Sequence, residues 1–265
     1  MSTVYFSETS DREQFVRKIL ELFNQRFQKS KKIFVKPNIV SYEPYPTTTH
    51  PKVLEAVLKG FSGREVIVGD APAIDAGRSN RILQKSPLRK ICEDWGAKFV
   101  NLYSEKMKIV ESPRGYSVRV SMLPEACDLV ISIPVLKIHG MVGLSGALKN
   151  QFGYLSKRDR LMMHCKVKSI YKGIAEVNVA VHTDLFIVDA VETMIKAQEC
   201  RHGGCPAGLN TMMAGSDPVS LDCFGLKLLE RVEPKFESRN RQALTYIGYA
   251  SEYGLGEETF EAKRI

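Results

Sequence analysis

The chain has 265 residues, of which 44% are hydrophobic and 26% charged, and its formal net charge is +8. This length and composition are typical of a soluble globular protein with one large domain. No apolar run approaches the roughly 18 residues that a membrane span requires, and no basic region followed by an apolar stretch opens the chain. We therefore expect a cytoplasmic protein that does not associate with a membrane.

Segments with helical and strand patterns alternate along the chain. An apolar stripe at helical spacing between Phe15 and Phe27 predicts the first helix. Further helices are predicted at residues 49–61, 79–96 with a break near Pro87, 169–183, 218–232 and 240–254. Short apolar runs predict strands at residues 32–38, 64–72, 97–102, 127–137, 184–190 and 208–217.

This alternation predicts a single α/β domain over residues 1–265, with a largely parallel, Rossmann-like sheet and helices on both faces. The predicted strands are continuously apolar, which is typical of strands that are buried on both faces. Residues 104–121 alternate on either side of Pro113-Arg114-Gly115, so they predict a small β-hairpin insertion.

Polar side chains follow five of the predicted strands at the carboxyl end. They are Lys36 with Asn38, Asp70, Lys137 with His139, Asp189, and Ser216 with Asp217. In an open parallel sheet, ligands bind in the crevice outside these ends. Lys36 and Lys137 lie directly against apolar residues, so each needs a carboxylate or an anionic ligand. For Asp217, which precedes a proline and an apolar helix, a helix cap is the preferred interpretation.

Residues 137–153 carry many small and cationic side chains directly after the most apolar strand. The small residues are Gly140, Gly143, Ser145 and Gly146. We expect a helix whose first residues have small side chains, so that its backbone amides can approach an anion. Lys149 and Asn150 would lie further along this helix. The alternative is a small-residue face for close packing of a helix on the sheet. The spacing matches neither the dinucleotide fingerprint nor the P-loop.

Two further segments could contact a ligand. Residues 45–51 contain three threonines and His50 directly before a predicted helix. Capping accounts for one threonine, and the others either bond to neighbouring backbone or contact the ligand. In residues 156–168, His164 lies among Arg158, Arg160, Lys166 and Lys168, and the segment is either a lid over an anion or an exposed basic face.

Several of these segments together resemble one protein family. They are "FVKPNIV", "TTTHP", "VIVGDAP", "DLVISIPVLKIHGMVGLSGALKNQFG", "LFIVDA" and "MAGSDPVSLD". In this order they resemble the domain of unknown function 362 family from about Ile33 to the C-terminus. Larger members of that family carry iron–sulfur ferredoxin modules, and this chain shows no such module.

The resemblance implies a set of recurring polar positions, several of which also end predicted strands. These positions are Lys36, Asn38, Thr48, His50, Asp70, Lys137, His139, Lys149, Asn150, His164 and Asp189. The family itself is uncharacterised, so the resemblance implies a fold and a set of site residues, and no activity.

The six cysteines are too sparse for a disulfide scaffold, and no Cys-x-x-Cys pair occurs. Cys200, His202 and Cys205 nevertheless lie close together in the sequence, where relatives tend to have a glycine-rich loop. Two thiolates and an imidazole suit zinc or iron. Metal binding, a redox-responsive thiol pair and ordinary loop cysteines all remain open interpretations.

The first functional interpretation is an enzyme that acts on a small molecule bearing phosphate or carboxylate groups. Lys36, Lys137 and Lys149 would neutralise the anion. His139 or His164 would transfer protons, because only histidine titrates near neutrality without perturbation. The sequence contains no nucleophile elbow and no H-E-x-x-H helix, so no motif indicates the reaction.

Two aspartates complete this interpretation, because Asp70 and Asp189 would orient the histidine or bind Mg²⁺ together with the anion. The predicted catalytic groups are therefore His139, His164, Asp70 and Lys137. The predicted ligand contacts are Lys36, Asn38, Thr48, His50, Gly143, Ser145, Lys149, Asn150 and Asp189.

Two other interpretations come from different classes. The first is an iron–sulfur or metal-associated redox protein that works with ferredoxin-like partners, and it depends on the family resemblance and on Cys200, His202 and Cys205. The second is nucleic-acid binding through the net charge of +8. Against this interpretation, the basic residues of the chain are dispersed, and residues 156–168 lack the interleaved aromatic side chains that stack on bases.

Overall fold

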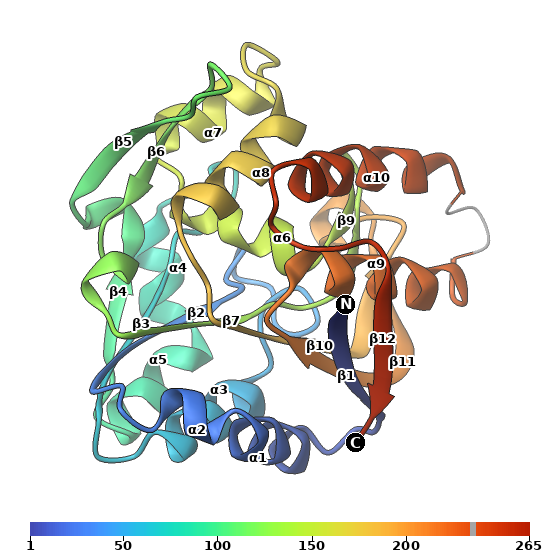
Figure 1. Ribbon diagram of the computed structural model, residues 1–265. Coiled ribbons are helices and arrows are strands. Elements are labelled where there is room, and N and C mark those ends of the chain that lie inside the picture. The colour runs from blue at the N-terminus through green and yellow to red at the C-terminus, as the bar shows by residue number, and fades with distance from the viewer. Residues whose placement is uncertain (234–236) are drawn as a thin grey trace.

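An eight-stranded sheet runs through the centre of the computed structural model, which describes residues 1–233 and 237–265 (Figure 1). From one edge to the other, its strands are β12 (Phe260–Arg264), β1 (Ser2–Glu8), β11 (Cys205–Gly215), β10 (Leu185–Ile195), β7 (Leu129–Ile133), β2 (Lys32–Pro37), β3 (Glu65–Asp70) and β4 (Lys98–Asn101). Within this sheet β11 runs against its neighbours, whereas the other strands share one direction. The expected largely parallel, Rossmann-like sheet is confirmed.

The strand order reverses between β2 and β7. From β2 the chain adds β3 and β4 on one side, and it then returns to place β7 and β10 on the other side. In open α/β sheets, such a reversal leaves a crevice at the carboxyl ends of the two strands, where ligands bind. Because β2 leads to Asn38 and β7 leads to Lys137, this crevice collects the predicted polar side chains.

Strand residues alternate between two hydrophobic layers. In β2, Phe34 faces one layer, whereas Ile33 and Val35 face the other. The layer of Ile33 is covered by α1 (Arg12–Leu22), α2 (Asn24–Phe27), α3 (Pro51–Gly60), α4 (Ser79–Lys85) and α5 (Pro87–Asp94) (Figure 1). The layer of Phe34 is covered by α6 (Ala147–Asn150), α7 (Lys157–His164), α8 (Ile170–Ala180), α9 (Pro218–Glu230) and α10 (Glu237–Glu252). The predicted coverage of both faces is therefore confirmed.

Local sequence sets the ends of these helices. Ser86 has an extended backbone before Pro87, so it ends α4, and its hydroxyl accepts the amide hydrogen of Leu88 at the start of α5. Asp217 caps α9 by accepting from Ser220 N. Because β11 runs antiparallel, Asp217 lies at the opposite edge of the sheet from the crevice, and the cap interpretation is confirmed.

The predicted hairpin insertion is present as β5 (Met107–Glu111) and β6 (Ser117–Ser121), which pair antiparallel. Short 3₁₀ turns connect the larger elements. They are η1 (Leu102–Ser104), η2 (Pro124–Ala126), η3 (Gln151–Tyr154) and η4 (Cys200–His202). In the described parts of the chain, no helix is both long and apolar enough to cross a membrane.

The helix expected over residues 137–153 is wrong. The chain first forms a second hairpin, in which β8 (Lys137–His139) pairs antiparallel with β9 (Gly143–Ser145), and only α6 and the 3₁₀ turn η3 that follows it are helical. Gly143 has a φ of +82°, a conformation that glycine adopts without strain at a turn. Gly143 therefore serves a tight turn, whereas Gly146, before α6, leaves room for the side chain of Asp222.

The edge strand β12 and its neighbour β1 were not predicted. In β1, Val4 is fully buried and Tyr5 packs against Phe23, so a run of β-branched and aromatic residues is the signal that identifies it. β12 is mostly exposed and rich in charge, which is typical of a protected sheet edge and leaves little hydrophobic pattern to read.

Candidate functional site

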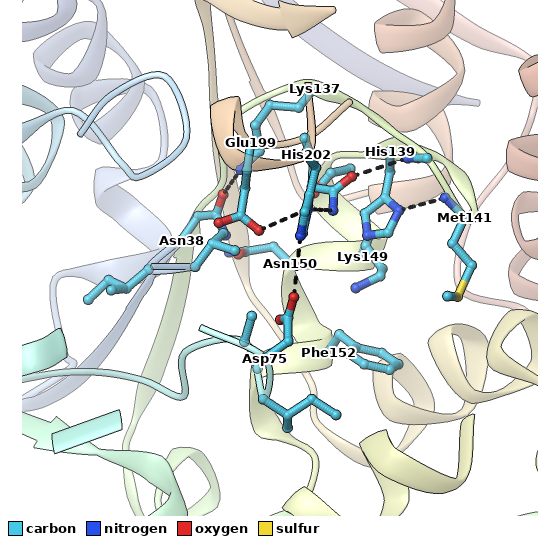
Figure 2. A pocket seen from close by; sticks show the side chains of 18 of the residues that line it. Asn38, Asp75, Lys137, His139, Met141, Lys149, Asn150, Phe152, Glu199 and His202 are labelled. Atoms are coloured by element: carbon cyan, nitrogen blue, oxygen red, sulfur yellow. Dashed lines mark hydrogen bonds and ion pairs between the residues drawn. The ribbon is translucent and has the colours of Figure 1, made fainter. Parts of the chain in front are cut away.

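A cavity of about 800 Å³ lies at the strand-order reversal. Its wall brings together ten of the side chains that the sequence predicts. They are Lys36, Asn38, Asp70, Lys137, His139, Ser145, Lys149, Asn150, His164 and His202. Figure 2 shows that several of them converge from separate segments of the chain. This volume is in the range of pockets that hold small organic ligands.

Lys36 and Asp70 form a buried ion pair on the cavity wall. Lys36 Nζ lies 2.7 Å from Asp70 Oδ1. The other oxygen of Asp70 accepts the amide hydrogen of Ile39 at 2.6 Å. Burial lowers the pKa of Lys36, and Asp70 opposes this shift. The two charges therefore neutralise each other, and both oxygens of Asp70 already accept hydrogen bonds from the protein.

Lys137 is buried without a contacting carboxylate in the described residues. Its Nζ donates to Asn38 Oδ1 at 2.8 Å and to the carbonyl oxygen of Thr47 at 2.6 Å. Burial lowers the pKa of Lys137 to about 8, although Glu199 and more distant carboxylates favour the charged form. Two neutral acceptors fix the position of this ammonium group and leave its charge without a direct counterion.

Lys149, from α6, has no hydrogen bond or ion pair within the described part of the chain. Its Nζ lies 3.9 Å from the centroid of the Phe152 ring. Burial lowers the pKa of Lys149 to about 7, and the nearby charges of Arg160, Lys137 and Lys36 lower it further. The amine thus faces the cavity at a point where protonation is disfavoured.

Arg160 is a site residue that the sequence did not single out. It is only 5% exposed, and α7 directs it onto the cavity wall. Its guanidinium donates to the carbonyl oxygens of Phe152, Pro72 and Ala71, each at 3.0 Å. Three of its five N–H donors are used by neutral acceptors. The guanidinium also lies over the rings of Tyr103 and Phe152, and no carboxylate of the described residues pairs with it.

A hydrogen bond from the backbone fixes the tautomer of the neutral His139 ring. Met141 N donates to His139 Nδ1 at 3.2 Å, so the proton of the neutral ring is on Nε2. Burial lowers the pKa of His139 well below its ordinary value, and Lys149 and Lys137 add to this effect. The ring therefore offers a neutral N–H donor, and the predicted acid–base role of His139 near neutral pH is not favoured.

His164 has the complementary arrangement. Its Nδ1 lies 2.7 Å from the carbonyl oxygen of Arg160, so Nδ1 carries a proton and Nε2 has the free lone pair. Burial is the main cause that lowers the pKa of His164. His139 and His164 thus line one cavity as a hydrogen-bond donor and a proton acceptor, respectively.

A cluster of charged side chains, here called the clamp, borders the same cavity and consists of Glu199, Arg201, His202 and Asp75. Glu199 is 1% exposed, and its two oxygens pair with Arg201 at 2.8 Å each. His202 lies between Glu199 and Asp75, at 3.6 Å and 3.4 Å (Figure 2). The acidic side chains of the clamp are thus engaged with Arg201 and His202, and they do not contact the ammonium groups of Lys137 or Lys149.

Four predicted ligand contacts lie outside the cavity wall. His50 caps α3 by accepting from Lys52 N, and burial lowers its pKa to about 4. Thr48 is buried, and its hydroxyl has no partner in the described residues. Gly143 forms the turn between β8 and β9.

Asp189 is the fourth, and the structure does not bring it to Asp70. Its carboxylate is paired with Arg12 Nε at 2.7 Å and accepts from Tyr45 Oη at 2.9 Å. β10 also continues past Asp189 to Ile195, because its antiparallel pairing with β11 extends the strand. The expected role of Asp189 beside a histidine or Mg²⁺ in this site is therefore wrong.

The start of α6 does not present free amides to a ligand. The amides of Ala147 and Leu148 donate to the carboxylate of Asp222, at 2.6 Å and 3.2 Å. Burial raises the pKa of Asp222 to about 7. The predicted anion site at this helix start is therefore wrong, because a side chain from α9 already occupies it.

The predicted metal ligands do not converge. Cys200 is exposed, Cys205 begins β11, and His202 is engaged with the clamp. Across residues 1–233 and 237–265, no group of three or more His, Cys, Asp or Glu side chains is arranged to hold a metal ion. The metal site proposed for Cys200, His202 and Cys205 is therefore not formed in this structure.

Comparison with known proteins agrees with this fold. The family model described as Domain of unknown function (DUF362) matches residues 33–227. No curated protein matches the chain by sequence. Among solved structures, the lactate racemase apoprotein from Thermoanaerobacterium thermosaccharolyticum superimposes with a TM-score of 0.58 and 16% identity. The match covers 88% of this chain and 58% of that protein, so this chain corresponds to a little over half of its length.

Proposed function

Because the chain belongs to the domain of unknown function 362 family, whose name gives no activity, we propose a function from the cavity itself. The protein binds a small organic anion that bears carboxylate or phosphate groups, and it acts on this ligand as an enzyme. The observation that carries the proposal is the set of cations on the cavity wall that contact no carboxylate. They are Lys137, Lys149 and Arg160.

Buried charges without counterions are costly, so this arrangement favours a ligand that supplies the negative charge. Lys137 is pinned by Asn38 and Thr47, and Arg160 is pinned by three carbonyl oxygens. Both cations are thus held in position before the ligand binds. Preorganised donors of this kind stabilise an anion without a further cost of ordering side chains.

The apolar part of the wall favours an organic ligand over a bare ion. Ile39, Val40, Ile74, Met141 and Phe152 line the cavity together with the cations. An anionic group held by Arg160 and Lys137 would therefore leave its carbon skeleton against apolar side chains. Lactate, for which the structural neighbour is named, is one small carboxylate of this class, and the likeness at 16% identity supports the fold only.

The two histidines support an enzymatic role. His139 offers an N–H donor, and His164 offers a lone pair to the same cavity. A donor can stabilise negative charge that develops on an oxygen, and a lone pair can accept a proton from the substrate. We therefore assign His164 as the proton acceptor and His139 as the hydrogen-bond donor of the proposed reaction.

Isothermal titration calorimetry with phosphate, lactate, citrate and pyruvate tests the binding step at pH 7. The wild-type protein should bind at least one of these anions, and Lys137→Met should weaken that binding by about ten-fold or more, as expected for a lost charge-assisted contact. Lys18→Met is the matched control, because Lys18 is an exposed lysine on α1 that does not line the cavity. It should leave the affinity unchanged.

Equal affinities in wild type, Lys137→Met and Lys18→Met would contradict the proposal. So would binding that Lys18→Met weakens as much as Lys137→Met, since this result would indicate a general effect of the net charge.

A further inference from the structure

We propose that Lys149 is an amine nucleophile that forms an imine with the carbonyl carbon of an oxo acid bound in this cavity. The inference rests on the proposed function, because the carboxylate of the oxo acid would occupy the anion site. It adds a reaction type and a substrate class, namely small carboxylates that carry a ketone or aldehyde group.

Four lysines line the cavity, and the surroundings of three of them, Lys36, Lys137 and Lys149, separate their roles. Lys36 is paired with Asp70, and Lys137 donates to two neutral oxygens. Lys149 has no polar partner in the described residues, and its amine lies over the Phe152 ring. Of these three lysines, only Lys149 can therefore approach a substrate atom without first breaking a hydrogen bond.

Burial, and after it the cations around Lys149, lower the pKa of its amine. Arg160, Lys137 and Lys36 act in this direction, and Asp70 opposes them only in part. A pKa of about 7 leaves about half of the side chain neutral at pH 7, whereas an ordinary lysine with a pKa near 10.4 is neutral in well under 1% of molecules. An amine next to other cations is one of the known ways to activate a lysine nucleophile.

The two histidines distinguish a nucleophile from a simple base. His164 already offers a neutral lone pair to the cavity, so proton abstraction does not require a second base. Attack of an amine on a carbonyl instead requires a donor for the carbonyl oxygen and an acceptor for the proton of the amine. His139 and His164 supply these two groups, and Figure 2 shows Lys149, His139 and Phe152 around one space.

The step balances without an oxidant or a reductant. The nitrogen lone pair of Lys149 forms the C–N bond, and the carbonyl π pair moves to oxygen, which the Nε2–H of His139 stabilises. His164 accepts a proton from nitrogen and passes it to this oxygen, which gives a carbinolamine. The remaining nitrogen proton leaves through His164 to the hydroxyl group, water departs, and the C=N bond forms.

Reductive trapping tests the proposal. Wild-type protein is incubated with pyruvate, 2-oxobutyrate or 2-oxoglutarate and sodium cyanoborohydride, and the product is analysed by intact mass and peptide mapping. We expect one reduced adduct per chain, on the peptide that contains Lys149. Lys18→Met should keep the adduct, and Lys149→Met should lose it. Adducts spread over exposed lysines, or an adduct that persists in Lys149→Met, would overturn the proposal.

A second measurement does not depend on the choice of oxo acid. A neutral acylating reagent is applied across pH 6 to 10, and the extent of labelling is measured for each lysine peptide. Lys149 should react about ten-fold faster than Lys18 at pH 7, because far more of its amine is neutral. Labelling of Lys149 no faster than that of Lys18 would overturn the proposal.

Failure of this inference differs from failure of the proposed function. If phosphate or lactate binds in calorimetry but no oxo acid is trapped, only the imine step is contradicted. If none of the anions binds, the proposed anion site is contradicted, whatever the reactivity of Lys149.

Discussion

Lys36 Nζ lies 2.7 Å from Asp70 Oδ1, and the two side chains are only 1% and 3% exposed. Asp70 also accepts the backbone amides of Ile39 and Ala71, at 2.6 Å and 2.8 Å. One carboxylate thus joins β2, β3 and the loops that follow them. The wall of the cavity is therefore rigid where the strand order reverses, and the neighbouring cations are held on a fixed frame.

Asp70→Asn should lower the free energy of unfolding by about 3–5 kcal/mol, because it leaves a buried ammonium group without its counterion. Urea denaturation at pH 7 measures the change. The control is Glu65→Gln at the exposed pair of Lys32 and Glu65, which should cost about 1 kcal/mol or less. Similar losses for the two variants would contradict a buried, structural role for Asp70.

Gly153→Ala should destabilise the protein and disturb the cavity. A Cβ atom at Gly153 would collide with the side chains of Lys36 and Asp70. The matched control is Gly248→Ala in α10, where no atom lies within 4 Å of the added carbon, and where alanine should stabilise the helix by about 1 kcal/mol. Thermal unfolding compares the two variants, and we expect their midpoint temperatures to shift in opposite directions.

Stability should rise with pH between about 7 and 10.5 because of Lys137 and Lys149. Their pKa values in the folded protein, about 8 and about 7, lie below the ordinary value of 10.5. In this window the unfolded chain binds more protons, so raising the pH favours the folded state. Denaturation at several pH values should show a smaller slope in Lys137→Met and Lys149→Met. An unchanged slope in both variants would contradict the prediction.

Asp222 should act in the opposite direction at lower pH. Burial raises its pKa to about 7 from an ordinary value of 3.8, so between these values the folded protein binds more protons and stability falls as the pH rises. Relative to Asp222→Asn, the wild-type protein should therefore be most stable near pH 4 and lose part of that advantage by pH 7. A constant difference in urea denaturation would show that Asp222 keeps its ordinary pKa.

Anion affinity should fall as the pH rises from 7 to 9, because Lys137 loses its proton in that range. Binding should also be accompanied by proton uptake, since an anion next to Lys137 raises its pKa. Calorimetry in two buffers with different ionisation enthalpies measures this uptake. Affinity that increases with pH would contradict the assignment of Lys137 as a binding cation.

Much of the fold and part of the site were predictable because polar side chains follow apolar strands in the sequence. Lys36 and Lys137 follow apolar runs, and such charges in a buried strand require a partner whatever the fold. The parallel topology then places the ends of β2 and β7 at one edge. Asn38, Asp70 and His139 were placed on the cavity wall by the same argument.

The remaining site residues depend on contacts between distant segments. Arg160 lines the cavity because α7 packs against the loops of Ala71 and Phe152, and no spacing in the sequence encodes this. Asp222 covers the start of α6 from 75 positions away. Asp189 was misplaced for the same reason, because its partner Arg12 lies 177 positions away.

A crystal structure of the protein with bound tungstate, a dianion that mimics phosphate and scatters strongly, tests whether the cavity is an anion site. We expect the anion between the Nζ atoms of Lys137 and Lys149 and the guanidinium of Arg160, and no ordered anion in crystals of Lys137→Met. Tungstate that occupies only exposed lysines, with the cavity free of it in the wild-type crystal, would show that the cavity does not bind anions.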